Sequence, residues 1–176
     1  MRVSRGQLDP SSKLTLSLVL FKNVQNIPQL RKRVMDGSLK CCLIKPSMIV
    51  HPLQVTVAAN KAVLNYKQGT MKTKTLFTEV LYNLSSSKNI SQSLVKFGVH
   101  DEDKNLLVAF LEEGSESDNM QSSLRLIEGE QCPVEQISEF SDENLIRKTY
   151  SIKDLESSVS PLINSIITRI STVDVM

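Results

Sequence analysis

Six consecutive apolar residues, Leu106 to Leu111, constrain this chain of 176 residues more than any other feature. Successive side chains of a strand point to opposite faces of its sheet, so a strand that is apolar at every position is covered on both faces. We therefore expect a central strand over 105–111. Leucines at alternate positions from Leu14 to Leu20 predict a second strand over 13–21 with one buried face.

Apolar repeats with capping residues predict several helices. Their expected starts are at Asn26, Pro52, Thr73 or Thr75, Ser91, Ser141 and Ser160. The helix over 52–67 carries one apolar stripe, which consists of Val55, Ala59, Ala62, Val63 and Tyr66. Ile90 and Val95 are expected to form a hydrophobic staple around the Ser91 cap.

The remaining segments carry weaker secondary-structure patterns. Residues 150–152 are expected to form an edge strand, 1–12 to be partly disordered, and the acidic, serine-rich segment 114–123 to be a mobile loop. About three strands and six or seven helices follow, with no internal repeat. The sequence thus predicts an α/β (α+β) fold: a single domain over 1–176, with a small mixed or antiparallel sheet packed against several helices.

Charge is divided unevenly along the chain. Residues 1–100 hold fifteen Lys and Arg against three acidic residues, and 101–176 hold six against sixteen. Asp36 and Glu79 enclose a stretch with six lysines and no acid. Such a run suggests a surface for a polyanion, unless the two halves interleave in the fold and their signs mix in space.

Composition narrows the class of protein. The cysteines are three in number, with Cys41 and Cys42 adjacent, and their spacing fits neither a disulfide framework nor a metal site. No stretch approaches the roughly 18 apolar residues that span a bilayer. We expect a soluble protein of the cytoplasm and nucleus, monomeric outside any complex, with no metal, no cofactor and no membrane association.

Catalytic patterns are missing. The two histidines, His51 and His100, are far apart in the sequence, and no nucleophile elbow or phosphate-binding glycine loop occurs. His51 is expected to cap or flank a helix start, and His100 to be solvated. Glu79 is expected to form a salt bridge with Lys72 or Lys74, or to act at a helix start, in preference to serving as a general base.

Several short stretches, in this order and spacing, carry a family resemblance. They are 20–24 (LFKNV), 46–50 (PSMIV), 57–63 (VAANKAV), 69–75 (GTMKTKT), 78–79 (TE), 83–85 (NLS), 89–91 (NIS), 96–98 (KFG), 112–114 (EEG) and 169–172 (RIST). With them the chain resembles the small kinase-binding subunit of the KEOPS/EKC complex, the PRPK-binding protein family. The resemblance covers some 150 residues.

The resemblance implies a non-enzymatic α/β domain. Members of this family bind and stimulate the small atypical kinase, an ATPase, of a complex that attaches threonylcarbamoyl to adenosine in tRNA anticodon loops. Related archaeal subunits also hold the single-stranded CCA tail of the tRNA. By resemblance, the expected partners are therefore a PRPK-like kinase and tRNA.

Candidate RNA contacts lie in and after the 52–67 helix. The lysines Lys61, Lys67, Lys72 and Lys74 could contact phosphates. Asn60 could read a base edge, or its amide could bond to a neighbouring loop. Met71 could pack on a base or fill the core, whereas Tyr66 is expected in the core.

Candidate kinase contacts centre on the C-terminal helix. They are Phe97, Leu162, Ile166, Arg169 and Ile170. The favoured interpretation is that the apolar face of this helix simply covers the sheet. A hydrophobic patch left at the edge of the helix would then mark the docking surface. A stand-alone basic RNA-binding module without a kinase partner is the alternative function, and an unrecognised small enzyme is disfavoured.

Overall fold

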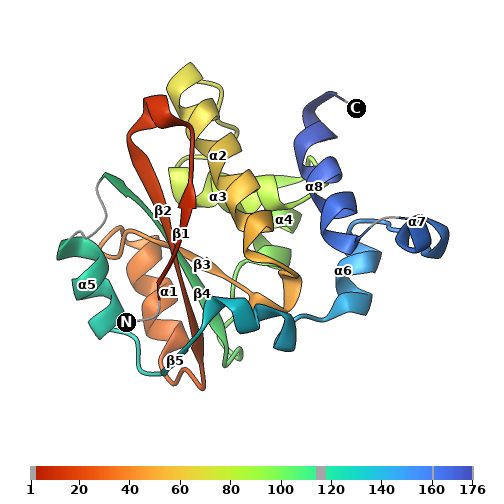
Figure 1. Cartoon of the computed structure of the whole chain (residues 1–176). Coiled ribbons are helices and arrows are strands. Elements are labelled where there is room, and N and C mark those ends of the chain that lie inside the picture. The colour runs from red at the N-terminus through yellow and green to blue at the C-terminus, as the bar shows by residue number, and fades with distance from the viewer. Residues whose placement is uncertain (1–2, 114–117, 160, 176) are drawn as a thin grey trace.

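A five-stranded antiparallel sheet organises this computed structural model, which describes residues 3–113, 118–159 and 161–175 (Figure 1). The strands are β1 (Ser4–Gln7), β2 (Leu14–Lys22), β3 (Cys42–Ile44), β4 (Leu106–Glu113) and β5 (Glu130–Cys132). Their order is β1-β2-β4-β3, and β5 pairs with β2. The expected α/β class is confirmed, and every strand pair is antiparallel.

The predicted central strand lies between the two strands that precede it in the sequence. β4 pairs with β2 over its whole length, and its middle residues also pair with β3. On the other edge of β2, β1 pairs with the first half of the strand and β5 with its last three residues. Segments from both halves of the chain thus meet in one sheet.

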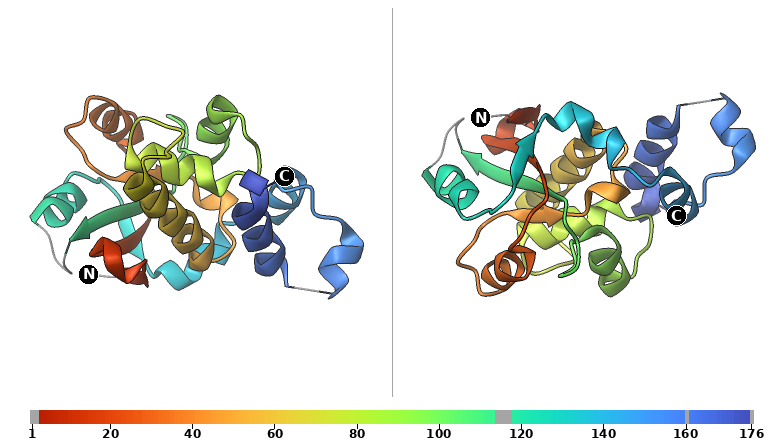
Figure 2. Two further views of the ribbon diagram at one scale, coloured as in Figure 1. Left: turned by 90° about the horizontal axis from the view of Figure 1, so that it is seen from above. Right: turned by 90° about the horizontal axis from the view of Figure 1, so that it is seen from below.

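Helices cover both faces of this sheet (Figures 1 and 2). α1 (Ile27–Met35) and α5 (Asp118–Arg125) pack on one face. The other face carries α2 (Pro52–Gln68), α3 (Leu76–Leu84), α4 (Ile90–Phe97), α6 (Glu143–Thr149) and α8 (Leu162–Thr172). α7 (Asp154–Val159) projects from the body of the molecule (Figure 2). The 3-10 turns are η1 (Pro10–Ser12), η2 (Pro46–Met48), η3 (Val134–Glu139) and η4 (Val173–Val175).

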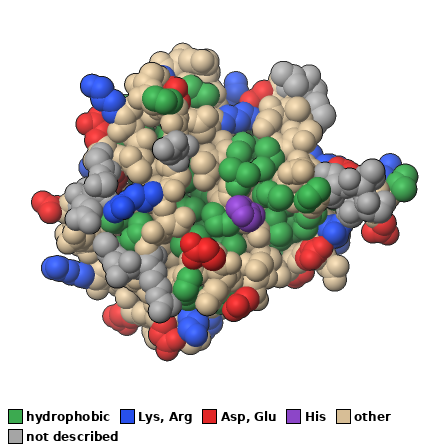
Figure 3. Space-filling view, in the orientation of Figure 1, with side chains coloured by type: hydrophobic (Ala, Val, Ile, Leu, Met, Phe, Trp, Pro, Cys, Tyr) green, Lys and Arg blue, Asp and Glu red, His purple; other side chains and the backbone are tan. Residues whose placement is uncertain are grey.

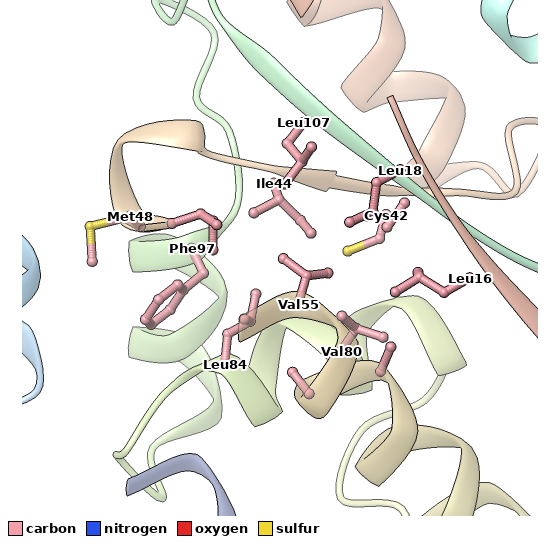
Figure 4. Packing of buried hydrophobic residues seen from close by; sticks show 14 of the residues in the cluster. Leu16, Leu18, Cys42, Ile44, Met48, Val55, Val80, Leu84, Phe97 and Leu107 are labelled. Carbon is pink, nitrogen blue, oxygen red and sulfur yellow. The ribbon is translucent and has the colours of Figure 1, made fainter. Parts of the chain in front are cut away.

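Side-chain alternation in β4 divides the core in two. Leu107, Ala109 and Leu111 join the larger cluster, part of which is shown in Figure 4, and the residues between them join a smaller cluster beneath α1 and α5. The expected burial of this strand on both faces is confirmed. β2 behaves in the same way: Val19 and Phe21 are buried opposite its leucines, so the prediction of one buried face was wrong.

The longest helix is confirmed together with its ends. The His51 Nδ1 accepts a hydrogen bond from the Leu53 N–H at 3.0 Å, Pro52 is the first helical residue, and Gly69 ends the helix with φ of 68°. A side chain is strained at that φ, which is why glycine stops the helix here. For the next helix, Thr75 is the cap, in a capping box with Thr78.

Other caps differ from the prediction. α4 is capped by Asn89, and Ile90 and Val95 are exposed, so no staple forms there. α6 is capped by Asp142, while the Ser141 hydroxyl bonds to the Ile49 carbonyl. Asn26 makes no capping bond, because its amide bridges to the backbone of Leu126 and Glu128. Ser160 lies outside the described residues.

Three segments differ in kind. Residues 118–123, expected in a mobile loop, belong to α5, because Met120 and Leu124 can be buried against the sheet; the rest of that loop, 114–117, is outside the described residues. Strand β1 and turn η1 form where 1–12 was expected to be partly disordered. Residues 150–152 are not a strand, because Tyr150 ends α6 and is buried in the core.

Candidate interaction surfaces

Charges from the two halves of the chain meet in space. Among the residues that the structure describes, the ion pairs that join the basic half to the acidic half include Lys22–Glu130, Arg31–Asp101, Lys45–Asp103 and Lys61–Asp174. The uneven division of charge along the sequence therefore does not become a surface of one sign. The basic residues with a possible role in anion binding have to be identified individually.

Three of the predicted RNA contacts hold the fold together. Lys61 Nζ lies 2.7 Å from Asp174 Oδ2 and donates to the Ile170 carbonyl at 3.0 Å, so it fastens α8 to α2. Lys67 pairs with Asp9 at 3.4 Å. Asn60 Oδ1 accepts from the Asp9 N–H at 2.7 Å, so its amide bonds to a neighbouring loop. The Ser11 hydroxyl and Lys67 lower the pKa of Asp9.

Lys72 and Lys74 lie in the loop before α3 and are exposed, and neither forms an ion pair with another described residue. The loop is held from within by Glu79, whose side chain is fully buried. Its carboxylate accepts from the N–H groups of Lys72 at 3.1 Å and Thr73 at 2.9 Å, and from the Thr73 hydroxyl at 2.7 Å. The predicted salt bridge from Glu79 to Lys72 or Lys74 is therefore wrong: backbone N–H groups replace the lysine.

A shallow depression of about 390 Å³ lies beside this loop. Its lining comprises Asn65, Thr70, Lys72, Tyr82, Lys88 and Asp174. Sequence reasoning missed Lys88, which follows α3 and gave no helical or motif signal of its own. Met71 is half-buried, and Tyr66 is 61% exposed, so the expectation that Tyr66 belongs to the core is wrong.

Three of the predicted kinase contacts are inside the molecule. Phe97, Ile166 and Ile170 have no exposed surface, which argues against their direct contact with a partner. Phe97 packs on Tyr150 with ring centroids 5.9 Å apart. Arg169 is held by Glu156, with its Nη1 2.6 Å from Glu156 Oε1. Leu162 is half-buried at the start of α8.

Apolar side chains remain accessible where α2 and α8 run together. Leu53 is 44% exposed, and Val57, Ile163 and Ile167 are half-buried. We call these four residues the apolar face. Figure 3 shows hydrophobic side chains gathered over the first turns of α2 and over α8. Leu53 and Val57 are one turn apart on α2, beside its buried stripe, and this spacing was the available signal in the sequence.

The described residues hold no cluster of metal ligands and no helix that could cross a bilayer, and the thiols of Cys41 and Cys42 are buried. Within 3–113, 118–159 and 161–175, no three His, Cys, Asp or Glu side chains are grouped to hold a metal. No described helix combines the length and apolarity that crossing a bilayer requires. Burial raises the pKa of the Cys41 thiol to about 12 and that of Cys42 well above its usual value, so both thiols stay protonated.

Comparison with known proteins identifies the family. The family described as "Kinase binding protein CGI-121" matches residues 21–174. The chain is 37% identical over 161 residues to the EKC/KEOPS complex subunit TPRKB of Danio rerio, with 92% of both chains covered. It is 29% identical to the EKC/KEOPS complex subunit cgi121 of Aspergillus fumigatus, with 83% of this chain and 81% of that protein covered. The corresponding subunit of Yarrowia lipolytica is 27% identical, with 81% and 83% covered. The chain therefore belongs to the CGI-121 family of kinase binding proteins.

Proposed function

We propose that this chain is a non-catalytic subunit of a KEOPS/EKC complex, and that it binds and stimulates the small atypical kinase of that complex through the apolar face. The family match supports a partner of this kind, and the curated relatives bear the names of complex subunits. The observation that carries the proposal is the accessible apolar seam between α2 and α8.

The chemistry of this seam suits a protein partner. Its four aliphatic side chains lose water when a second apolar surface covers them, and each fully buried one contributes about 1.5–3 kcal/mol to association. Beside them lies the Lys61–Asp174 ion pair, which gives the seam a polar margin. An apolar centre with a charged rim is the usual anatomy of a protein interface.

The test replaces Leu53 by Glu and measures binding to the kinase subunit by titration calorimetry. A carboxylate at this position is left unpaired inside the interface, so we expect Leu53→Glu to weaken binding by about 30-fold or more. The variant should fold, because Leu53 is exposed in the first turn of α2, where a negative charge is favourable.

Leu126→Glu is the matched control. Leu126 is 37% exposed and follows α5, on the other face of the sheet. It should bind the kinase as the unaltered protein does and stimulate its ATPase equally. Equal loss in both variants, or undiminished binding by Leu53→Glu, contradicts the assignment of the apolar face.

A second part of the proposal concerns tRNA. In it, Lys72, Lys74 and Lys88 contact phosphates near the CCA tail and so support threonylcarbamoyladenosine formation. Lys72 and Lys88 both line the depression beside the 71–73 loop, and Lys74 follows that loop. Each phosphate contact adds a salt-dependent increment to affinity.

Titration of tRNA with and without its CCA end, at two salt concentrations, tests this part. We expect removal of the tail to weaken binding, and Lys72→Glu to abolish the difference between the two tRNAs. Binding that ignores the tail and vanishes with salt favours the alternative, a basic module that attracts RNA without the family role. Kinase binding by Lys72→Glu should be unchanged.

A further inference from the structure

A second apolar hollow lies away from the apolar face. It is a groove of about 640 Å³ between α1 on one side and α3 and α4 on the other, with the 37–43 segment and β3 as its floor. Figure 2 shows α1 and α4 projecting on the same side of the molecule. No residue of the apolar face lines this groove. An occupant here is therefore compatible with a partner on α2 and α8.

The rim of the groove is positively charged. Arg31, Lys40 and Lys74 are among its lining residues, and none of the described lining residues is acidic. Arg31 is paired with Asp101, whereas Lys40 and Lys74 are exposed and form no ion pair with a described residue. The groove takes much of its wall from the acid-free stretch of the sequence. Its electrostatics therefore suit a ligand with negative charge outside the hollow.

The interior is apolar. Its floor consists of Cys41, Cys42 and Leu43, and its walls include the aliphatic side chains of Val34, Leu39, Leu81, Leu94 and Val99. The hydroxyls on the wall, Thr75 and Thr78, are already bonded to each other in the capping box of α3. A nucleobase needs hydrogen-bond partners at its edge. An aliphatic or aromatic side chain needs none, and it fits this lining better.

The floor is also the edge of the sheet. β3 is the last strand in the order. Its outer side meets the end of α4 at Ile44, which bridges to Gly98, and at the Lys45 N–H, which donates to the Phe97 carbonyl at 2.8 Å, whereas Cys42 and Leu43 line the groove. An edge strand presents backbone groups to a chain that lies along it. This favours an extended peptide over a compact ligand.

We propose that the groove binds an extended acidic peptide segment of a partner protein. A bulky apolar side chain of the segment enters between α1 and α3, and neighbouring carboxylates pair with Lys40 and Lys74. This site does not depend on the proposed kinase contacts. It shares Lys74 with the proposed tRNA contacts, so that side chain can pair with only one of the two ligands at a time.

The experiment titrates the isotope-labelled full chain with the blocked peptide Glu-Asp-Phe-Asp-Glu and follows amide chemical shifts. We expect shifts confined to the segments that line the groove, which are 31–43, 74–81 and 94–99. Replacement of the peptide's Phe by Ala should weaken binding by about 30-fold, the value of a buried aromatic side chain. Replacement of its acidic residues by Lys should abolish it.

Lys40→Glu is the informative protein variant. It reverses a rim charge at an exposed position and should weaken binding of the Phe peptide by about fivefold. Lys32→Glu is its matched control, because Lys32 is exposed on α1 and does not line the groove. Binding by this control should change by less than about twofold. An unaltered melting temperature shows that both variants are folded.

Three outcomes overturn the proposal. If the Phe and Ala peptides bind equally well, the peptide is held by charge attraction alone and no side chain enters the groove. Absence of any shift at millimolar peptide means that the groove takes no such ligand. Shifts of the same amides by the oligonucleotide ACCA, with the peptide inert, mean that the groove is an RNA site instead.

Discussion

Backbone N–H groups from two successive residues converge on the carboxylate of Glu79. Such a concave arrangement of N–H groups attracts anions, and here the anion is a side chain of the same molecule. Asn65 adds a further donor at 3.3 Å, so the carboxylate has partners on both oxygens. The shape of the 71–73 loop, and with it the direction in which Lys72 points, follows from this one residue.

Substitution of Glu79 by Gln tests whether its carboxylate holds the 71–73 loop in place. An amide turns an N–H₂ group toward donors that need an acceptor, so we expect a loss of about 1–3 kcal/mol in the free energy of unfolding. Urea unfolding measures it. Glu102→Gln, at an exposed position, should leave the unfolding free energy unchanged within about 0.5 kcal/mol. If both variants are equally stable, the Glu79 contacts contribute little.

Residue roles at this scale were predictable only in part. The sequence indicates that Asn60 and Lys61 lie on a helix, and it offered loop bonding as one role for Asn60. It does not reveal that the carboxylates of Asp9 and Asp174, from the two ends of the chain, come close to that helix. Closeness in the sequence led to the wrong partner for Glu79, because its carboxylate bonds to the backbone N–H of Lys72 and not to the lysine side chain.

At the scale of elements, an ion pair fastens α7 to α8. Arg169 holds Glu156 with two hydrogen bonds, at 2.6 and 2.8 Å. These bonds, with one from Ser165, lower the pKa of Glu156 to about 2. The projecting helix α7 is therefore tied to the body of the molecule by a charged contact near the solvent.

The stabilising effect of this pair should depend on pH. Glu156 ionises more readily in the folded state than in the unfolded state, so its contribution is complete above its ordinary pKa of 4.5 and is lost as the pH falls toward 2. We expect unaltered protein to be more stable than Glu156→Gln at pH 7, with the difference shrinking below pH 4.5.

Denaturant unfolding of both proteins from pH 7 to pH 3 measures that difference. Glu143→Gln, which removes an exposed pair with Arg147 one turn away, is the control and should have little effect. A difference that persists unchanged at pH 3 excludes ionisation of Glu156 as its cause.

Elements with strong local signals were predictable. α2 has a cap, a proline at its start, a buried stripe and a glycine at its end. β1 and β5 were not predictable, because four and three residues carry too little pattern, and they become strands through pairing with β2. α5 was hidden by its polar composition, since only Met120 and Leu124 mark its buried side as apolar.

At the scale of the whole molecule, the two halves of the sequence complete one sheet. β2 and β3 come from the first half, and β4 from the second half fills the place between them. The mixing of charges has the same origin, because the interleaved halves bring Lys45 beside Asp103 and Lys22 beside Glu130. Charge counts along a sequence cannot reveal such interleaving.

This topology predicts the behaviour of fragments. Residues 1–104 alone lack the strand between β2 and β3, so we expect the fragment to show no cooperative unfolding by circular dichroism. Joint refolding with 105–176 should restore a one-to-one complex with the spectrum of the intact protein. Cooperative unfolding of 1–104 on its own contradicts the central role of β4.

The late position of β4 also matters while the protein is being made. β3 ends at Ile44, and β4 is complete only at Glu113. At about 5–20 residues per second, the ribosome needs about 3–14 seconds to supply the missing strand. During that interval the edges of β2 and β3 that pair with β4 in the native sheet have no native partner. A chaperone that holds the nascent chain from the synthesis of β3 to the synthesis of β4 should therefore improve the yield of native protein.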